Sequence, residues 1–348
     1  MRGKATFVIS LDFELFWGLR DHRRLEEVGP RLLGVRQVVP ALLELFQQRG
    51  IRATWATVGF LFARSREEIL ASLPRRLPAY AHRELSPYAH LAEIGANEEE
   101  DPYHFAPSLI EAIANAEGQE LGSHTFSHYY CLEEGQGLEQ FRADLQAHLA
   151  IARRQGIILR SLVFPRNQVQ RSYLEVCRDL GFTAYRGTPP LWPHQPSSDR
   201  ATSTVQRLAR AADNLLPLTG TRCVSAGHFY NRRPLNVQAS RFFRPFAGSS
   251  PWLSRLQIRR IRGELDYAAT TGGLYHLWWH PHNFGLHLEA HLEALKAILD
   301  RFQEWERLGK MESLTMHEVV MGRGSTEEIS PPSGRAPFSD PLSLSRRV

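Results

Sequence analysis

Apolar and polar positions alternate along this chain in runs that predict alternating strands and helices. Residues 5–11 form a continuous, β-prone apolar run of the kind found in buried parallel strands. Apolar residues then recur at helical spacing over 32–48, a segment closed by Gly50, and residues 51–58 predict a second strand. A strand, a helix and a strand in this order make a βαβ unit, which implies a parallel sheet.

The alternation continues to about residue 320 and predicts a barrel-like α/β domain. Further strands are predicted over 120–122, 159–164, 183–185 and 274–279, and helices over 109–117, 138–155, 173–180, 205–215, 255–270 and 288–307. Residues 63–107 are less regular and predict short helices and loops, a lid-like excursion over a site. The pattern therefore predicts one domain over residues 1–321, followed by a disordered tail at 322–348.

Composition narrows the class of protein. The net charge is +5, and only three of the 42 basic residues are lysines. Arginine binds phosphate and carboxylate groups well, but the excess of positive charge is modest and spread along the sequence. Solvated surface arginines are therefore favoured over a nucleic-acid-binding surface.

The three distant cysteines, Cys131, Cys177 and Cys223, argue against a disulfide framework. No apolar run reaches the ~18–20 residues of a membrane span, and Asp12 and Glu14 interrupt the first run early, so we expect a cytoplasmic protein without a secretory signal.

Reactive side chains follow four of the predicted strands. They are Asp12 with Glu14, His124 with His128, Arg166, and His280. In α/β barrels the active site is assembled at the carboxyl-terminal ends of the strands, so these groups are expected to share one edge. Four polar groups at four strand ends are a stronger signal than any one of them.

The first two groups suit a metal site. Asp12 and Glu14 are two apart, so both carboxylates can face one site, where one binds a metal and the other takes a proton; alternatively they cap the next segment. His124 and His128, at i and i+4, lie on one face if the segment is a helical turn, although 15 histidines make a chance pair plausible. An acidic residue with two histidines and an open position for water is a catalytic zinc set.

The other two groups have equally ordinary alternatives. Arg166 can receive a carboxylate or form a surface ion pair. His280 follows an apolar segment with two tryptophans, where it can act as a general acid or be a histidine satisfied in the core.

Taken in order, these segments resemble the polysaccharide deacetylase family, also called the NodB-homology domain or carbohydrate esterase family 4. The segments that carry the resemblance are 10–14, 53–59, 118–128 and 277–281, and the likeness spans about residues 5–308. It implies a distorted, incomplete (β/α) barrel with its site at the carboxyl ends of the strands.

Three departures from the family pattern point to a divergent branch. The adjacent aspartate pair is spread into Asp12-x-Glu14, the arginine-and-proline motif appears only as residues 164–168, and the aspartate-tryptophan motif has no clear match. By analogy, such a branch acts on a lipid- or nucleotide-linked sugar instead of a wall polymer.

The resemblance implies metal-assisted hydrolysis of an N-acetyl sugar. The ligands of a divalent ion would be Glu14, His124 and His128; zinc is favoured, and cobalt, nickel or iron also fit. Asp12 would be the base, kept ionised by Arg166, and His280 would protonate the leaving amine.

Two other functions stay open. One keeps the metal but changes the amide, to an N-formyl sugar or a small cyclic amide. The other is a non-catalytic domain of the same fold that binds a sugar or polyanion through the basic segment 255–262, whose simpler interpretation is a helix with an exposed cationic face.

Overall fold

A single curled parallel sheet organises the structure, a computed structural model that describes residues 3–189, 213, 220, 223–224, 233–246 and 248–322. Its strands are β1 (Ala5–Phe13), β2 (Ala53–Thr57), β3 (Gln119–Ser123), β4 (Ser161–Val163), β5 (Ala184–Arg186), β6 (Leu235–Asn236), β7 (Arg241–Phe242), β8 (Leu274–Trp279) and β9 (Met311–Ser313). They lie in the order β6-β5-β4-β3-β2-β1-β8-β7, and β9 also pairs with β1. Every pairing between them is parallel. No pairing joins β6 to β7 within the described residues, so the sheet is an incomplete (β/α) barrel, as expected.

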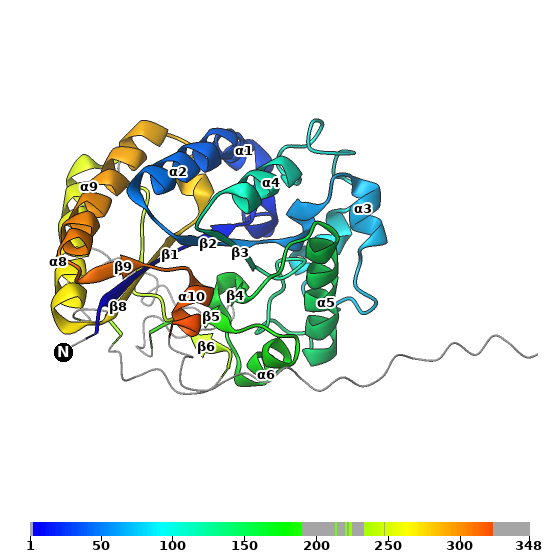
Figure 1. Cartoon of the computed structure of the whole chain (residues 1–348). Coiled ribbons are helices and arrows are strands. Elements are labelled where there is room, and N and C mark those ends of the chain that lie inside the picture. The colour runs from blue at the N-terminus through cyan, green and yellow to red at the C-terminus, as the bar shows by residue number, and fades with distance from the viewer. Residues whose placement is uncertain are drawn as a thin grey trace, which may run out of the picture.

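Helices follow the outer side of the sheet (Figure 1). They are α1 (Leu25–Leu33), α2 (Val35–Arg49), α3 (Arg66–Ala71), α4 (Pro107–Asn115), α5 (Leu138–Arg154), α6 (Arg171–Asp179), α8 (Pro251–Thr271) and α9 (Leu288–Arg307). The short helix α10 (Met316–Met321) instead packs Met316 and Val319 against inward-facing residues of β1 and β8. Its Glu318 pairs with Arg52, just before β2, so α10 covers the amino-terminal end of the strands.

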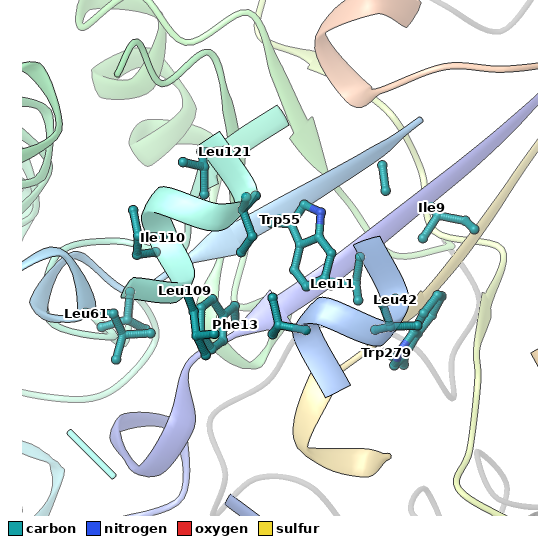
Figure 2. Close-up of a cluster of buried hydrophobic side chains, with 14 of the residues drawn as sticks. Ile9, Leu11, Phe13, Leu42, Trp55, Leu61, Leu109, Ile110, Leu121 and Trp279 are labelled. Atoms are coloured by element: carbon teal, nitrogen blue, oxygen red, sulfur yellow. The ribbon is translucent and has the colours of Figure 1, made fainter. Parts of the chain in front are cut away.

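The alternation of β1 places its side chains on two faces. Ile9, Leu11 and Phe13 point outward and pack, together with Trp55 and Leu42, beneath the helices (Figure 2). Residues on the opposite parity point into the barrel, because successive side chains of a strand face opposite sides. Those residues are Val8, Ser10 and Asp12, all buried. Because the apolar side chains of β1 pack outward against the helices, the alternate side chains, including that of Asp12, are directed into the barrel.

Most predicted helices and strands agree with the structure, apart from one helix boundary and several short elements. The helix predicted over 32–48 is two helices, α1 and α2, which meet at Gly34. The strands β6, β7 and β9 and the helix α10 were not predicted. The helix predicted over 205–215, apart from Asp213, and the tail predicted from 322 onward, apart from Gly322, lie outside the described residues.

The segment 63–107 carries α3 and two 3-10 turns, Arg83–Leu85 and Pro87–His90. It is tied to the rest of the molecule near the site: the Tyr80 hydroxyl accepts the Tyr130 N–H at 2.9 Å, and the Tyr88 hydroxyl donates to Asp144 at 3.4 Å. A lid role for this segment stays a prediction.

Two further expectations concern the whole chain. All three cysteines are free thiols, two of them buried. Among the described helices, none combines the length and the apolar character needed to cross a bilayer.

Candidate metal centre and catalytic groups

Glu14, His124 and His128 meet at the carboxyl-terminal edge of the sheet. One carboxylate oxygen of Glu14, Oε2, lies 3.3 Å from His124 Nε2 and 3.1 Å from His128 Nε2. One ligand atom from each residue lies within 4.8 Å of the other two, and all three side chains are buried. The structure therefore brings together the three residues that we expected to bind a metal.

The segment that carries both histidines is an irregular loop, and the predicted helical turn is wrong. Thr125 and His128 have positive φ angles of 63° and 58°, which L-residues rarely adopt. The loop is held by Asp144 of α5, which accepts the Phe126 N–H at 2.7 Å and the Ser127 N–H at 3.2 Å. These bonds to a buried carboxylate hold the strained backbone that directs the two imidazoles at Glu14.

The protonation of these side chains suits a cation. His124 Nδ1 lies 2.9 Å from the carbonyl oxygen of Val163, which only accepts, so Nδ1 carries the hydrogen and Nε2 presents its lone pair to Glu14. Burial lowers the pKa of His128 to about 4, so this imidazole is neutral. Burial raises the pKa of Glu14, but the charge of His280 and the adjacent imidazoles of His124 and His128 more than offset this effect, leaving that pKa well below its usual value. Lone pairs and a carboxylate facing one another fit a divalent ion.

Asp12 is held by Arg186, and the expectation that Arg166 holds it is wrong. Arg186, at the end of β5, donates from Nη1 and Nη2 to the two oxygens of Asp12, each at 2.7 Å. Burial alone would raise the pKa of Asp12. The charge of Arg186 and the other positive groups nearby lower this pKa by more, so the net shift is downward. Asp12 is therefore an ionised carboxylate in a fixed orientation beside the candidate metal ligands.

A buried chain of hydrogen bonds orients Arg186 in turn. Its Nη1 also donates to Ser10 Oγ at 3.0 Å, and Ser10 lies 2.8 Å from His276 Nε2. His276 Nδ1 faces the Val237 carbonyl at 2.9 Å, so Nδ1 carries the hydrogen and Nε2 accepts from Ser10. Burial lowers the pKa of His276 to about 3, so its imidazole is neutral and Nε2 stays free to accept the hydrogen of Ser10.

His280 directly follows β8, which pairs with β1 on the side away from β2, and its side chain lies close to both carboxylates. Its Nε2 lies 3.5 Å from Glu14 Oε1 and 3.8 Å from Asp12 Oδ2, and its side chain is 22% exposed. Its ring stacks on His282 with centroids 4.9 Å apart and meets Trp278 edge-on at 5.8 Å. Packing against these rings orients His280, in place of the missing aspartate-tryptophan motif.

Arg166 lies on the other side of the centre and pairs with Asp21, a residue that the sequence pattern did not single out. Burial raises the pKa of Asp21, but a hydrogen bond from His22 and the charge of Arg166 bring it well below its usual value. Tyr130 also donates to this carboxylate, at 2.7 Å. Arg166 thus acts on the surroundings of His128 and not on Asp12.

Several of the residues that shape the site carried signals in the sequence. Arg186 directly follows the strand predicted over 183–185, and Arg166 lies just after the strand predicted over 159–164, so the two arginines were equivalent candidates. Asp144 and His148 stand at i and i+4 on the buried face of α5, where polar residues are unusual. Asp21 follows the first reactive pair closely but has no pattern of its own.

The basic segment 255–262 lies on α8 and matches the simpler of its two interpretations. Arg255, Arg259 and Arg262 are exposed, whereas Arg260 is directed at Glu264, 3.4 Å away. Among the described residues this is an exposed cationic helix face with one internal ion pair.

Part of the chain is similar to a known protein family. Residues 27–185 match the family model described as polysaccharide deacetylase. A search of curated proteins found no match. The match contains both histidines and ends just before Arg186, whereas Asp12, Glu14 and His280 lie outside it.

Solved structures share the fold at low sequence identity. A putative polysaccharide deacetylase from Mycobacterium smegmatis has a TM-score of 0.55 at 13% identity, covering 97% of this chain and 96% of that one. A probable polysaccharide deacetylase from Pseudomonas aeruginosa PAO1 has a TM-score of 0.55 at 11% identity, covering 93% and 92%. The PuuE allantoinase has a TM-score of 0.57 at 11% identity, covering 95% and 94%. The family match shows that residues 27–185 are similar to polysaccharide deacetylases, and the solved structures show that the chain shares their fold.

Proposed function

We propose that this protein is a metal-dependent hydrolase that removes the N-acetyl group from an amino sugar. The observation that carries the proposal is the meeting of Glu14, His124 and His128 beside Asp12 and His280. Amide hydrolysis by activated water needs ligands for an ion, a base and an acid, and these five side chains are of the right types. The family match supports a carbohydrate amide as the substrate.

The ligands proposed for the ion are Glu14, His124 and His128. One carboxylate and two imidazoles, with room left for water, make a common catalytic zinc set, which cobalt, nickel and iron also accept. A divalent ion held there would polarise the amide carbonyl and lower the pKa of its water toward ~7.

The chain's own groups supply the proton transfers. Asp12, held ionised by the guanidinium of Arg186, takes the proton from the attacking water. His280, partly exposed and close to both carboxylates, gives a proton to the departing nitrogen. Without that proton the amine is a poor leaving group, and the tetrahedral species returns to the amide. The products are acetate and a free amino sugar.

Acetate release tests this proposal directly. The purified protein, stripped with a chelator and reconstituted with zinc, is incubated with N-acetylated amino sugars, free and linked to a lipid or nucleotide phosphate. We expect acetate to appear only with the metal. His124→Ala and His128→Ala should lose the metal, whereas Asp12→Asn should keep it and lose turnover. Zinc binding without acetate from any of these sugars would refute the N-deacetylase assignment.

A second candidate keeps the centre and changes the amide. The fold is shared with an allantoinase, and allantoin is a cyclic amide. Ring opening of small cyclic amides, and formate release from N-formyl sugars, are therefore measured beside acetate. Sugar binding that survives Asp12→Asn, with no turnover by the wild type, would instead favour a non-catalytic binding domain.

A further inference from the structure

The second ring nitrogen of His128 leads away from the metal centre into a buried chain of side chains. His128 Nδ1 lies 3.2 Å from the Tyr130 hydroxyl oxygen, which lies 2.7 Å from Asp21 Oδ2. The His128 and Tyr130 side chains are buried, and that of Asp21 is 0% exposed. These contacts are therefore shielded from water, where the direction of each hydrogen bond is well defined.

The donor and the acceptor of each hydrogen bond between His128, Tyr130 and Asp21 follow from the number of hydrogens available. Asp21 pairs with Arg166, so its carboxylate is ionised and only accepts. Tyr130 has one hydroxyl hydrogen, which it donates to Asp21. The oxygen of Tyr130 must then accept from His128 Nδ1. In the other tautomer, Tyr130 would have to donate its one hydrogen to His128 Nδ1, and the oxygens of Tyr130 and Asp21 would then face each other at 2.7 Å with no hydrogen between them.

We propose that Tyr130 and Asp21 are positioning residues that fix His128 in the tautomer whose Nε2 lone pair faces Glu14. His128 Nε2 lies 3.1 Å from Glu14 Oε2, in the candidate centre, where its lone pair can bind a divalent ion. A ligand histidine whose other nitrogen donates to an oriented acceptor is fixed in ring orientation and becomes more basic. This inference rests on the proposed function only in taking His128 to be a metal ligand.

Arg166 completes the chain at its outer end. Its guanidinium pairs with Asp21 and also lies over the Tyr130 ring, 4.3 Å from the centroid. It therefore holds both the acceptor and the ring that connects the acceptor to His128. Arg166 and Asn167 both have φ angles of 53°, a strained conformation at the turn that presents this guanidinium.

The two histidines are oriented by different means. His124 donates to a backbone carbonyl, that of Val163, so few side-chain substitutions remove its acceptor. His128 depends on the Tyr130 hydroxyl. A substitution of that hydroxyl should therefore disturb one histidine and leave the other as it is.

Zinc affinity and histidine tautomers test the inference without any turnover. Zinc affinity is measured by competition with a chromophoric chelator, and the tautomers of the zinc-free protein by 15N NMR of the imidazoles, with His128 assigned by its loss in His128→Ala. Tyr130→Phe should weaken zinc binding about 10–100-fold and mix the His128 tautomers, with His124 unchanged. Asp21→Asn should act in the same direction, and the double variant should lose little more than the larger single effect.

Tyr129→Phe is the matched control. The neighbouring tyrosine is equally buried, and its hydroxyl accepts the Gly137 N–H and lies 3.0 Å from both the Gln136 side-chain oxygen and the Gly137 carbonyl, away from the two histidines. It should change stability but neither zinc affinity nor the His128 tautomer. If Tyr130→Phe does not fold, the zinc affinity and the His128 tautomer of Asp21→Asn are compared with those of Tyr129→Phe instead.

The outcomes separate the two proposals. A wild type that binds zinc, with Tyr130→Phe unchanged in affinity and tautomer, overturns the role of Tyr130 and leaves the proposed function standing. A wild type that takes up no divalent metal overturns both. Equal losses in Tyr130→Phe and Tyr129→Phe would mark the effect as general destabilisation, and this too overturns the inference.

Discussion

Glu14 lies directly against Gly18: a Cβ atom at position 18 would stand 2.0 Å from the Glu14 carboxyl carbon and 2.3 and 2.4 Å from its two oxygens. The 3-10 turn Leu15–Gly18 folds the chain back over this side chain. Any residue other than glycine at position 18 would have to displace the carboxylate. Gly18 thus keeps open the place where the candidate ligand stands.

Gly18→Ala should therefore lose metal affinity while the fold survives. A displacement of the Glu14 carboxylate by about 1 Å should also cost about 10²-fold in turnover. Zinc titration and circular dichroism check this. Gly263→Ala is the control, because a Cβ there has nothing within 4 Å. Full zinc affinity in Gly18→Ala would show that Glu14 does not need its present position.

Arg186→Lys and Arg166→Lys should produce opposite patterns. Arg186→Lys keeps the charge but loses the two-point grip on Asp12, so kcat should fall by about 10²-fold at unchanged zinc affinity. Arg166→Lys should chiefly weaken zinc binding, through Asp21 and Tyr130. Steady-state kinetics and zinc titration of both variants are the measurements. If Arg166→Lys lowers kcat more than Arg186→Lys does, at full zinc loading, the assignment of the two arginines is reversed.

His280→Ala should remove the acid, whereas His282→Ala should have a smaller effect. His280 Nε2 is close to both carboxylates, and general acids contribute about 10²–10⁴-fold to rate. His282 is buried, and burial lowers its pKa to about 3, so it is neutral near pH 7 and serves as the ring on which His280 stacks. The comparison is made in kcat with zinc saturating. A larger loss in His282→Ala would transfer the acid role to it.

Stability should fall as the solution is acidified below about pH 6.5. Burial lowers the pKa values of His148, His276 and His282 to about 3 each, from 6.5. Between these values the unfolded chain binds protons that the folded chain excludes, so the free energy of unfolding falls with pH. The slope is about 1.4 kcal/mol per pH unit for each such histidine.

Urea unfolding at pH 7 and pH 5 measures this effect. His148→Gln should make the loss of stability between the two pH values smaller by the contribution of one proton, because His148 is buried and its Nε2 has no hydrogen-bond partner among the described residues. An equal loss in wild type and His148→Gln would show that His148 takes up a proton without cost in the folded state.

The sequence predicted best those elements whose own pattern determines them. Residues 5–11 form a mostly apolar strand that is buried on both faces, and α9 runs over the predicted residues because its apolar spacing is regular throughout. The break between α1 and α2 could not be read in this way. Gly34 is approached by the backbone of Gly285, which would stand 2.1 Å from a Cβ there, and that contact comes from a distant part of the chain. The strands β6 and β7 have two residues each, too few for any period to show.

In the candidate site, the residue types were predictable but their partners were not. Glu14 and the two histidines converge as expected, because they follow β1 and β3, which lie on either side of β2 in one parallel sheet. The choice between Arg166 and Arg186 depends on which guanidinium points into the barrel. Arg186 is the last residue of β5 and faces inward, while Arg166 sits on a turn with positive φ that directs it elsewhere. A one-dimensional pattern contains neither orientation.

The pairing of β1 has a consequence for how the protein folds. Thr6 pairs with Leu274, and Ala5 pairs with Met311, so the strand that carries Asp12 is hydrogen-bonded to segments that lie far later in the sequence. Contacts so distant along the chain raise the contact order and slow folding. Until β8 pairs with β1, one side of β1 has no strand partner, and such an unpaired edge is prone to aggregation. Asp12 and Glu14 therefore meet His280 only after β8 has joined the sheet, so the candidate site is assembled late in folding.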